Sequence, residues 1–103
     1  MERHRQYKEI LILDHLLSTE GIPHEMKPSY DGYIIGFPDL EKDPDVLVSE
    51  SMMTYDSRLD LLELVDWTGK QYLSISAEGA MRIIRDAKDR LGIRKWKHGR
   101  RSL

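Results

Sequence analysis

A hairpin turn constrains the fold of this chain more than any other part of its sequence. Asp31-Gly32 stands between two β-prone stretches. Asp-Gly in that setting is typical of a two-residue type I′ turn, which needs positive φ at both central positions. With this pair at the tip, bulky side chains oppose one another across the two strands and share one face: Tyr30 with Tyr33, Pro28 with Ile35, and Met26 with Phe37.

Apolar periodicity predicts two helices and further strands around this hairpin. Helical spacing predicts one helix over residues 4–20 and a second over residues 76–91. Residues 59–67 fit a strand or a short helix, and length favours the strand because so short a helix would be marginal. The predicted strands are residues 24–29, 33–37, 46–53 and 59–67.

The ends of the helices are also marked in the sequence. Gly21 suits the left-handed position after a helix, and Pro23 prevents the helix from continuing. Ser76 is a good N-cap because its hydroxyl can accept a backbone N–H two or three residues further on. The sequence therefore predicts an α+β fold, a small antiparallel sheet of three to four strands with two helices packed on one face. The expected order is helix, hairpin, strand, strand, helix, with residues 1–93 as a single domain and residues 94–103 as a basic C-terminal tail.

The first helix carries more apolar surface than one buried face needs. Ile12 and Leu16 lie to the side of its main apolar stripe. Two interpretations remain open at this point: the helix packs between the sheet and another part of the chain, or Ile12 and Leu16 form a dimer or partner surface. The second interpretation would make the protein a homodimeric structural or assembly protein.

Charge is unevenly distributed along the chain. Residues 31–66 hold ten acids and two bases, whereas residues 82–101 hold nine bases and two acids. Separated charge of this kind bears on partners and not on fold. The expected acidic binding surface, which Tyr30 or Tyr55 could supply with an apolar anchor, comprises Asp39, Glu41, Asp43, Asp45, Asp56 and Asp60.

The basic tail supports a different interpretation, in which the protein binds nucleic acid. Cations next to Trp96 suit phosphate contacts combined with base stacking. The sequence pI near 6.1 argues against this, since a dedicated binder usually concentrates base over its body. The residues of this alternative site are Arg94, Lys95, Trp96, Lys97, Arg100 and Arg101.

The sequence holds no recognisable catalytic or metal-binding pattern. It has no cysteine, which excludes disulfides, thiolate zinc sites and thiol nucleophiles and indicates an intracellular protein. Its four histidines are scattered, without metal-ligand spacing. Glu25-Met26-Lys27 precedes Pro38-Asp39, the reverse of the order that a metal-dependent nuclease needs. We therefore expect no enzymatic activity, no metal and no cofactor, and no membrane span because no apolar run approaches about 18 residues.

Three short motifs carry a resemblance to a known group of proteins. Gly21-Ile22-Pro23-His24-Glu25, Asp31-Gly32-Tyr33 and Ile75-Ser76-Ala77-Glu78, the last opening a helix, resemble small uncharacterised proteins encoded by bacteriophages and prophages. The resemblance covers about residues 7–91 and brings no assigned active residues. It implies a small accessory protein in the cytoplasm of a bacterial host cell. Many such proteins bind host factors, and inhibitors of CRISPR nucleases are one well-populated class.

Charge and resemblance combine in one functional hypothesis. We expect a non-enzymatic accessory protein that presents its acidic loops to a basic groove on a host protein. The expected partner is a host nuclease or nucleoprotein defence complex, which the protein would inhibit in the manner of an anti-CRISPR. Nucleic-acid binding by the tail and homodimeric assembly through the first helix are the two alternatives.

Overall fold

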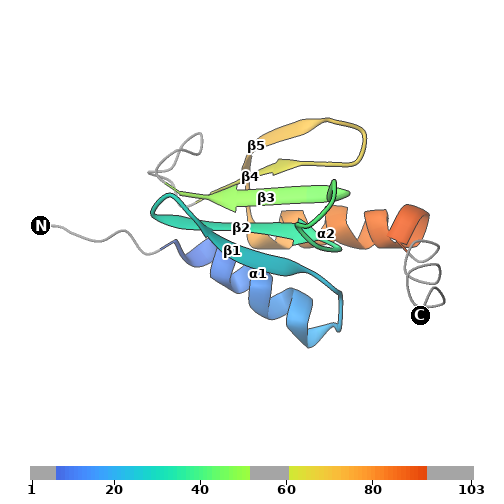
Figure 1. Cartoon of the computed structure of the whole chain (residues 1–103), viewed down its shortest axis with the longest axis horizontal. Helices are drawn as coiled ribbons and strands as arrows, with labels where there is room; N and C mark the ends of the chain where they lie inside the picture. Colours follow the sequence, from blue (N-terminus) through green and yellow to red (C-terminus); the bar gives the residue numbers. More distant parts are fainter. Residues whose placement is uncertain (1–6, 52–60, 93–103) are drawn as a thin grey trace, which may run out of the picture.

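Five strands of the described residues form one sheet and lie side by side in the order in which they occur in the chain (Figure 1). This computed structural model describes residues 7–51 and 61–92. Every neighbouring pair of strands is antiparallel. The strands are β1 (Glu25–Ser29), β2 (Gly32–Phe37), β3 (Val46–Glu50), β4 (Leu62–Val65) and β5 (Gln71–Ile75).

The predicted α+β class is confirmed, but the sheet is larger than the three to four strands predicted. The additional strand is β5, an edge strand for which the sequence gives no clear period-two pattern. Its register with β4 shifts between Leu62 and Leu64, so that a bulge interrupts the alternation of its side chains. Leu73 is exposed as a result of its place on this edge, and apolar spacing alone could not reveal the strand.

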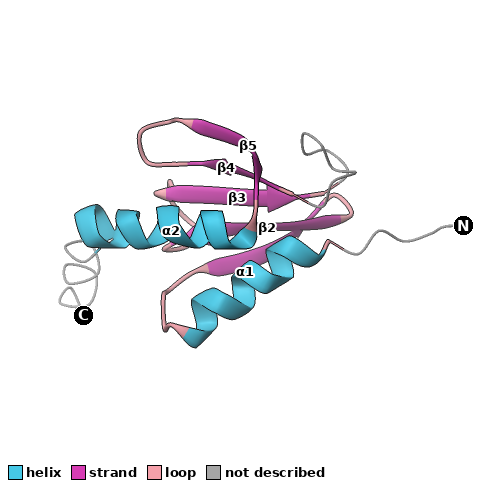
Figure 2. Ribbon diagram, turned by 180° about the vertical axis from the view of Figure 1, so that it is seen from behind, coloured by secondary structure: helices cyan, strands magenta, loops and turns pink. Residues whose placement is uncertain are grey.

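Two helices cover one face of the sheet, as expected (Figure 2). They are α1 (Lys8–Thr19) and α2 (Ala77–Ala87), and a short π-helix, η2 (Lys88–Gly92), continues α2. We call the face of the sheet toward the helices the inner face and the other the outer face. The core lies between the inner face and the helices, and its fully buried side chains include Ile10, Leu13, Leu17, Ile35, Phe37, Val46, Val48, Leu62 and Ile84.

The β1–β2 hairpin forms, but its turn lies one residue earlier than predicted. Ser29 pairs with Gly32, so Tyr30 and Asp31 are the two turn residues, and Tyr30 takes a positive φ of 55°. The predicted register is therefore wrong by two residues. The predicted faces are right, because a shift by an even number keeps each side chain on its own face. The observed pairs include Met26 with Ile35 and Pro28 with Tyr33.

Close contacts to other elements explain where the turn lies. A Cβ atom on Gly32 would lie 2.0 Å from the carbonyl oxygen of Glu50 in β3, so this glycine is needed for the close approach of two strands and not for the turn. The hydroxyl of Tyr7, just before α1, donates a hydrogen bond to the carboxylate of Asp31. Both contacts are tertiary, and the local sequence signal for the turn could not include them.

β4 confirms a strand within residues 59–67, and its buried side is the one that carries Leu62 and Leu64. Leu62 and Leu64 are buried on the inner face, whereas Leu61 and Val65 are half-buried. Apolar side chains occupy both odd- and even-numbered positions of this stretch, so the period-two pattern could not indicate which face of the strand is buried. Residues 52, 53, 59 and 60 of the predicted strands lie outside the described residues.

The end of α1 has the predicted stop. Gly21 has φ 70°, and its N–H donates to the carbonyl of Ser18 at 3.1 Å. The N–H of Ile22 donates to the carbonyl of Leu17 at 2.9 Å, and the Ile22 side chain is buried. These two bonds form a Schellman motif with its hydrophobic contact. The predicted stop after the second helix, at Gly92-Ile93, lies at the limit of the described residues.

The first turn of α1 is capped by a residue from the sheet. Tyr7 occupies the N-cap position and makes no side-chain capping bond. Glu50, whose side chain is 0% exposed, accepts a hydrogen bond from the N–H of Ile10 at 2.9 Å. A carboxylate at this place satisfies a backbone donor and interacts favourably with the positive end of the helix dipole.

The first turn of α2 combines a local cap with a distant one. Ser76 is the N-cap as predicted, and its hydroxyl accepts the N–H of Gly79 at 3.1 Å. The carboxylate of Glu9 in α1 accepts the N–H of Ala77 at 2.7 Å. A Cβ atom on Gly79 would lie 2.7 Å from the Ile75 side chain, which explains why no Glu or Gln completes a capping box there.

The two apolar side chains beside the main stripe of α1, Leu16 and Ile12, lie in different environments. Leu16 is half-buried and packs against the core, because α1 contacts both the sheet and α2. The first interpretation of the helix, packing between the sheet and another part of the chain, is thus confirmed for Leu16. Ile12 is 44% exposed beside the equally exposed Leu11. A dimer through Ile12 stays a prediction.

Candidate binding surface

The loop between β2 and β3 is held against the outer face of the sheet. We call residues 38–45 the acidic loop. The carboxylate of Glu25 in β1 accepts the N–H of Leu40 at 2.8 Å. The Leu40 side chain lies over Gly36, where an added Cβ atom would meet it at 2.5 Å. At the end of the loop, the N–H of Asp45 donates to the carbonyl of Phe37 at 2.7 Å. The loop therefore has a defined position beside the sheet.

The acidic loop presents three carboxylates to solvent. Asp39, Glu41 and Asp43 are exposed, and Asp45 is half-buried. The Asp39 carboxylate accepts the N–H of Glu41 at 3.1 Å, a short-range bond of the kind that shapes loops. The structure thus brings together four of the predicted partner-binding residues on one loop, with Lys42 as the one base among them.

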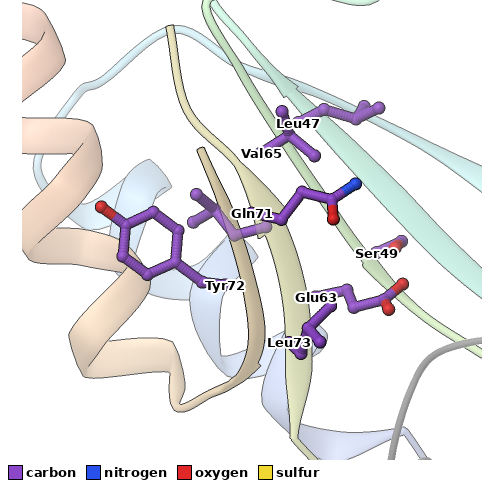
Figure 3. A pocket seen from close by; sticks show the side chains of 8 residues that line it. Leu47, Ser49, Glu63, Val65, Gln71, Tyr72 and Leu73 are labelled. Carbon is purple, nitrogen blue, oxygen red and sulfur yellow. The ribbon is translucent and has the colours of Figure 1, made fainter. Parts of the chain in front are cut away.

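A shallow hollow lies on the outer face next to this loop. It measures about 250 Å³ and is lined by the half-buried Leu47 and Val65 and by Leu73, which is 43% exposed. Polar groups at its border come from Ser49, Glu63 and Gln71. Figure 3 shows Tyr72, which also lines the hollow, directed to the opposite side of the strand. Neither helix covers this face (Figures 1 and 2).

Strand pairing connects the hollow to the acidic loop. One row across the sheet runs from Glu25 through Gly36, Leu47 and Val65 to Gln71, each residue paired with the next. The residues that anchor the loop are thus the outer-face neighbours of those that line the hollow. The result is an apolar strip with carboxylates at one end.

Sequence analysis did not assign these hollow-lining residues to a site. Leu47 and Val65 each lie in a strand that carries apolar side chains on both faces, beside the polar Ser49 and Glu63, and apolar side chains on both faces usually indicate burial on both sides. The mismatch between apolar side chains on both faces and helices on one face is the signal that could have identified them. It becomes visible only when the helices are placed.

Of the remaining predicted binding residues, the structure describes only Tyr30, which does not join this surface. Tyr30 is 75% exposed, but it lies in the β1–β2 turn at the opposite end of β2 from the acidic loop. The six residues of β2 separate the two by roughly 20 Å. Tyr55, Asp56 and Asp60 lie outside the described residues, so their part in partner binding stays a prediction.

Three acids of the 31–66 segment have structural roles instead. Asp31 accepts from Tyr7, and Glu50 caps α1. Asp66 is 8% exposed and organises the β4–β5 turn. Part of the charge counted in the sequence thus serves the fold, and among the acids of this segment that the structure describes, the exposed Asp39, Glu41 and Asp43 lie together on the acidic loop.

Asp66 accepts hydrogen bonds from three residues of its turn. One carboxylate oxygen accepts the N–H and the hydroxyl of Thr68 at 2.9 and 2.6 Å and the N–H of Lys70 at 3.1 Å. The other oxygen accepts the hydroxyl of Tyr72 at 3.2 Å. Burial alone would raise the pKa of this carboxyl, but the bonds from Thr68, Lys70 and Tyr72 outweigh it and hold the pKa below its usual 3.8.

Two bases, Arg85 in α2 and Arg90 in η2, form ion pairs within the domain. Arg85 makes a two-pronged ion pair with Glu20 at the end of α1, and this hydrogen bonding lowers the pKa of the Glu20 carboxyl. Arg90 contacts Asp86 at 2.7 Å, one helical turn earlier. The six residues of the predicted nucleic-acid site, from Arg94 to Arg101, lie outside the described residues, so that alternative stays a prediction.

The histidines in the described part of the chain serve no metal cluster. Within residues 7–51 and 61–92, no group of three or more His, Cys, Asp or Glu side chains could hold a metal ion. His24 lies between the carbonyl of Ile22 at 2.8 Å and the carboxylate of Asp14 at 2.7 Å, and so ties the connection after α1 to the helix. No described helix is both long and apolar enough to cross a membrane.

Comparison with known proteins gives no further guide to this surface. No protein family, no curated protein and no solved structure matches the chain.

Proposed function

We propose that this protein is a non-catalytic binding protein whose acidic loop and outer sheet face dock onto a basic, partly apolar surface of another protein. The resemblance to phage accessory proteins suggests a host nuclease or nucleoprotein defence complex, which the protein would inhibit by covering a basic groove. Proteins that bind nucleic acid carry such grooves. A carboxylate-rich surface that enters one of them competes with phosphate for the same cations.

The observation that carries this proposal is the apolar strip that neither described helix covers, with carboxylates at its end. Leu47, Val65 and Leu73 keep apolar surface in contact with water, although both helices pack on the other face. Exposed apolar surface rimmed by polar groups is a common feature of protein interfaces. The adjacent Glu41 and Asp43 select for a partner of positive charge.

Charge reversal in the acidic loop tests the proposal directly. Glu41 and Asp43 are suitable because both are exposed, whereas the half-buried Asp45 is part of the loop's connection to β3. The wild-type chain and the Glu41→Lys/Asp43→Lys variant are used to capture proteins from a bacterial lysate. The affinity of each for the captured protein is then measured. We expect the double reversal to weaken binding at least about tenfold, equivalent to about 1.4 kcal/mol, and to leave thermal stability almost unchanged.

A matched control distinguishes the effect of charge reversal in the acidic loop from the effect of charge reversal elsewhere on the surface. Glu78 is exposed at the start of α2, on the helical side of the molecule. Glu78→Lys is expected to retain the partner, at a cost in stability of a few tenths of a kcal/mol from the helix dipole. Equal binding by the wild type and the loop variant, or equal weakening by the loop variant and the Glu78 variant, would refute the proposal.

A further inference from the structure

The turn of the β1–β2 hairpin carries a large aromatic side chain that points into solvent. Tyr30 is 75% exposed, and its hydroxyl makes no hydrogen bond to any described residue. Its φ of 55° lies in the left-handed region, which glycine and asparagine adopt readily and bulky residues avoid. The chain thus has an aromatic residue at a position where a smaller residue would be more stable. Strain of this kind in an exposed residue points to a role outside the fold.

The backbone around Tyr30 is held in place by other elements. The hydroxyl of Tyr7 donates a hydrogen bond to the carboxylate of Asp31. Gly32 lies against the carbonyl of Glu50 in β3. An aromatic side chain on a fixed backbone loses little conformational freedom on binding, and tyrosine is frequent among the residues that dominate the affinity of interfaces. Tyr30 therefore has both the exposure and the support of such a residue.

The hollow on the outer face has the chemistry that a tyrosine side chain requires. It measures about 250 Å³, and Leu47, Val65 and Leu73 give it an apolar lining (Figure 3). Ser49 and Gln71 add polar groups at its border. A buried tyrosine needs apolar surroundings for its ring and a hydrogen-bond partner for its hydroxyl. The hollow offers both.

Tyr30 does not reach the hollow of its own chain. The hollow is lined by residues of β3, β4 and β5, whereas Tyr30 lies in the turn before β2. Of the lining residues, Ser49 lies nearest to the turn in the strand register, and it pairs with Ile34 of β2. Ile34 is four residues after Tyr30, a separation of roughly 10 Å along the sheet that a tyrosine side chain does not span. A Tyr30 that enters the hollow must belong to a second copy of the chain.

We propose that Tyr30 of one chain inserts into the outer-face hollow of a second copy, and that the protein self-associates through this contact. The inference goes beyond the proposed function and requires no host partner. The two contacting surfaces differ, so a chain that inserts its Tyr30 still has its own hollow open to a further copy. A tyrosine buries about 150–250 Å², far less than the roughly 1,600 Å² of a standard interface. The contact is therefore weak and depends on protein concentration.

Tyr30→Asn separates association from folding. Asparagine adopts positive φ more readily than tyrosine, so the variant should be at least as stable as the wild type in thermal unfolding. We expect self-association to weaken at least about tenfold, as it does when a dominant interface residue is lost. Sedimentation equilibrium of the full chain from about 10 µM to about 1 mM measures the association. A wild-type chain that stays monomeric over this range would overturn the inference and leave the hollow to a different protein. Association of Tyr30→Asn equal to that of the wild type would also overturn it.

Leu73→Lys tests the other half of the contact. Leu73 is 43% exposed on an edge strand, where lysine is well tolerated. Ile12→Lys is the matched control, because Ile12 is 44% exposed on α1, on the opposite side of the sheet from the hollow. We expect Leu73→Lys to weaken association at least about tenfold and Ile12→Lys to leave it unchanged. Equal weakening by both variants would contradict a contact at the hollow.

A mixture of the two association-deficient variants gives the sharpest result. Tyr30→Asn retains an intact hollow, and Leu73→Lys retains an intact Tyr30. Neither variant should associate alone over the range in which the wild type does. Their equimolar mixture should form a complex with one copy of each, because one productive contact remains for each pair. A mixture that sediments as monomers would rule out insertion of Tyr30 into the hollow.

Discussion

Asp66 shows how one side chain can organise a whole turn. Its two carboxylate oxygens accept hydrogen bonds from Thr68, Lys70 and Tyr72, and Gly69 supplies the positive φ (88°) that the turn needs. The loss of the charge should thus loosen the β4–β5 connection. Because this connection borders the hollow on the outer face, the effect of Asp66 extends to the candidate binding surface.

The lowered pKa of Asp66 predicts a defined pH dependence. A carboxyl whose pKa is lower in the folded than in the unfolded protein contributes stability above its unfolded pKa and loses it as the pH falls through the folded value. We expect Asp66→Asn to be less stable than the wild type at neutral pH. The difference in the free energy of unfolding should shrink as the pH falls below the usual 3.8. Chemical denaturation between pH 6 and pH 3 measures this difference, and a gap that stays constant would contradict the prediction.

At the scale of an element, the β1–β2 hairpin depends on a contact with its neighbour. Gly32 has the Glu50 carbonyl so close that any side chain must displace β3. Gly32→Ala is therefore expected to destabilise the fold by at least about 2 kcal/mol, as overpacking against backbone does.

Gly69→Ala is the matched comparison for that substitution. A Cβ atom there meets nothing within 4 Å, but φ is positive. The expected cost is only the backbone strain, about 1 kcal/mol. Thermal unfolding of both variants checks the order, and a larger loss at Gly69 than at Gly32 would mean that turn conformation outweighs strand packing in this sheet.

The β1–β2 hairpin, which contains Gly32, also shows which parts of the fold could be predicted from the sequence and which could not. The hairpin, its faces, the stop of α1 and the Ser76 cap all depend on neighbours within a few residues, and all were predicted correctly. The exact turn position depends on β3, and β5 depends on pairing with β4 across a bulge. Such contacts between distant residues leave little trace in local patterns.

The candidate site could likewise be predicted from the sequence only in part. The charge of the acidic loop can be read directly from residues 38–45. Its anchoring by Glu25 and Leu40, and its position beside Leu47 and Val65, require the sheet to be assembled. Tyr30 was predicted as an apolar anchor for the acidic surface, but the length of β2 separates it from the acidic loop.

At the scale of the whole molecule, charge governs how partners approach. The chain is nearly neutral at −2, yet acidic and basic residues are separated along it. Interactions between exposed charges weaken as salt shortens the screening length from about 10 Å at 0.1 M toward 3 Å at 1 M. We expect affinity for the partner to fall with rising salt, and the Glu41→Lys/Asp43→Lys variant to show a flatter dependence. Titrations at several salt concentrations measure both slopes, and an affinity that is independent of salt would assign recognition to the apolar strip alone.

The carboxylate caps on the two helices have a consequence for how the molecule comes apart. The first turn of α1 depends on Glu50 in β3, and the first turn of α2 depends on Glu9 in α1. When β3 separates from the rest of the sheet, a buried N–H in the first turn of α1 loses its carboxylate acceptor. Fraying of α1 then removes the carboxylate acceptor from the first turn of α2. Because each step leaves the next element less stable, partial opening is disfavoured, and the three elements tend to melt together in one cooperative transition.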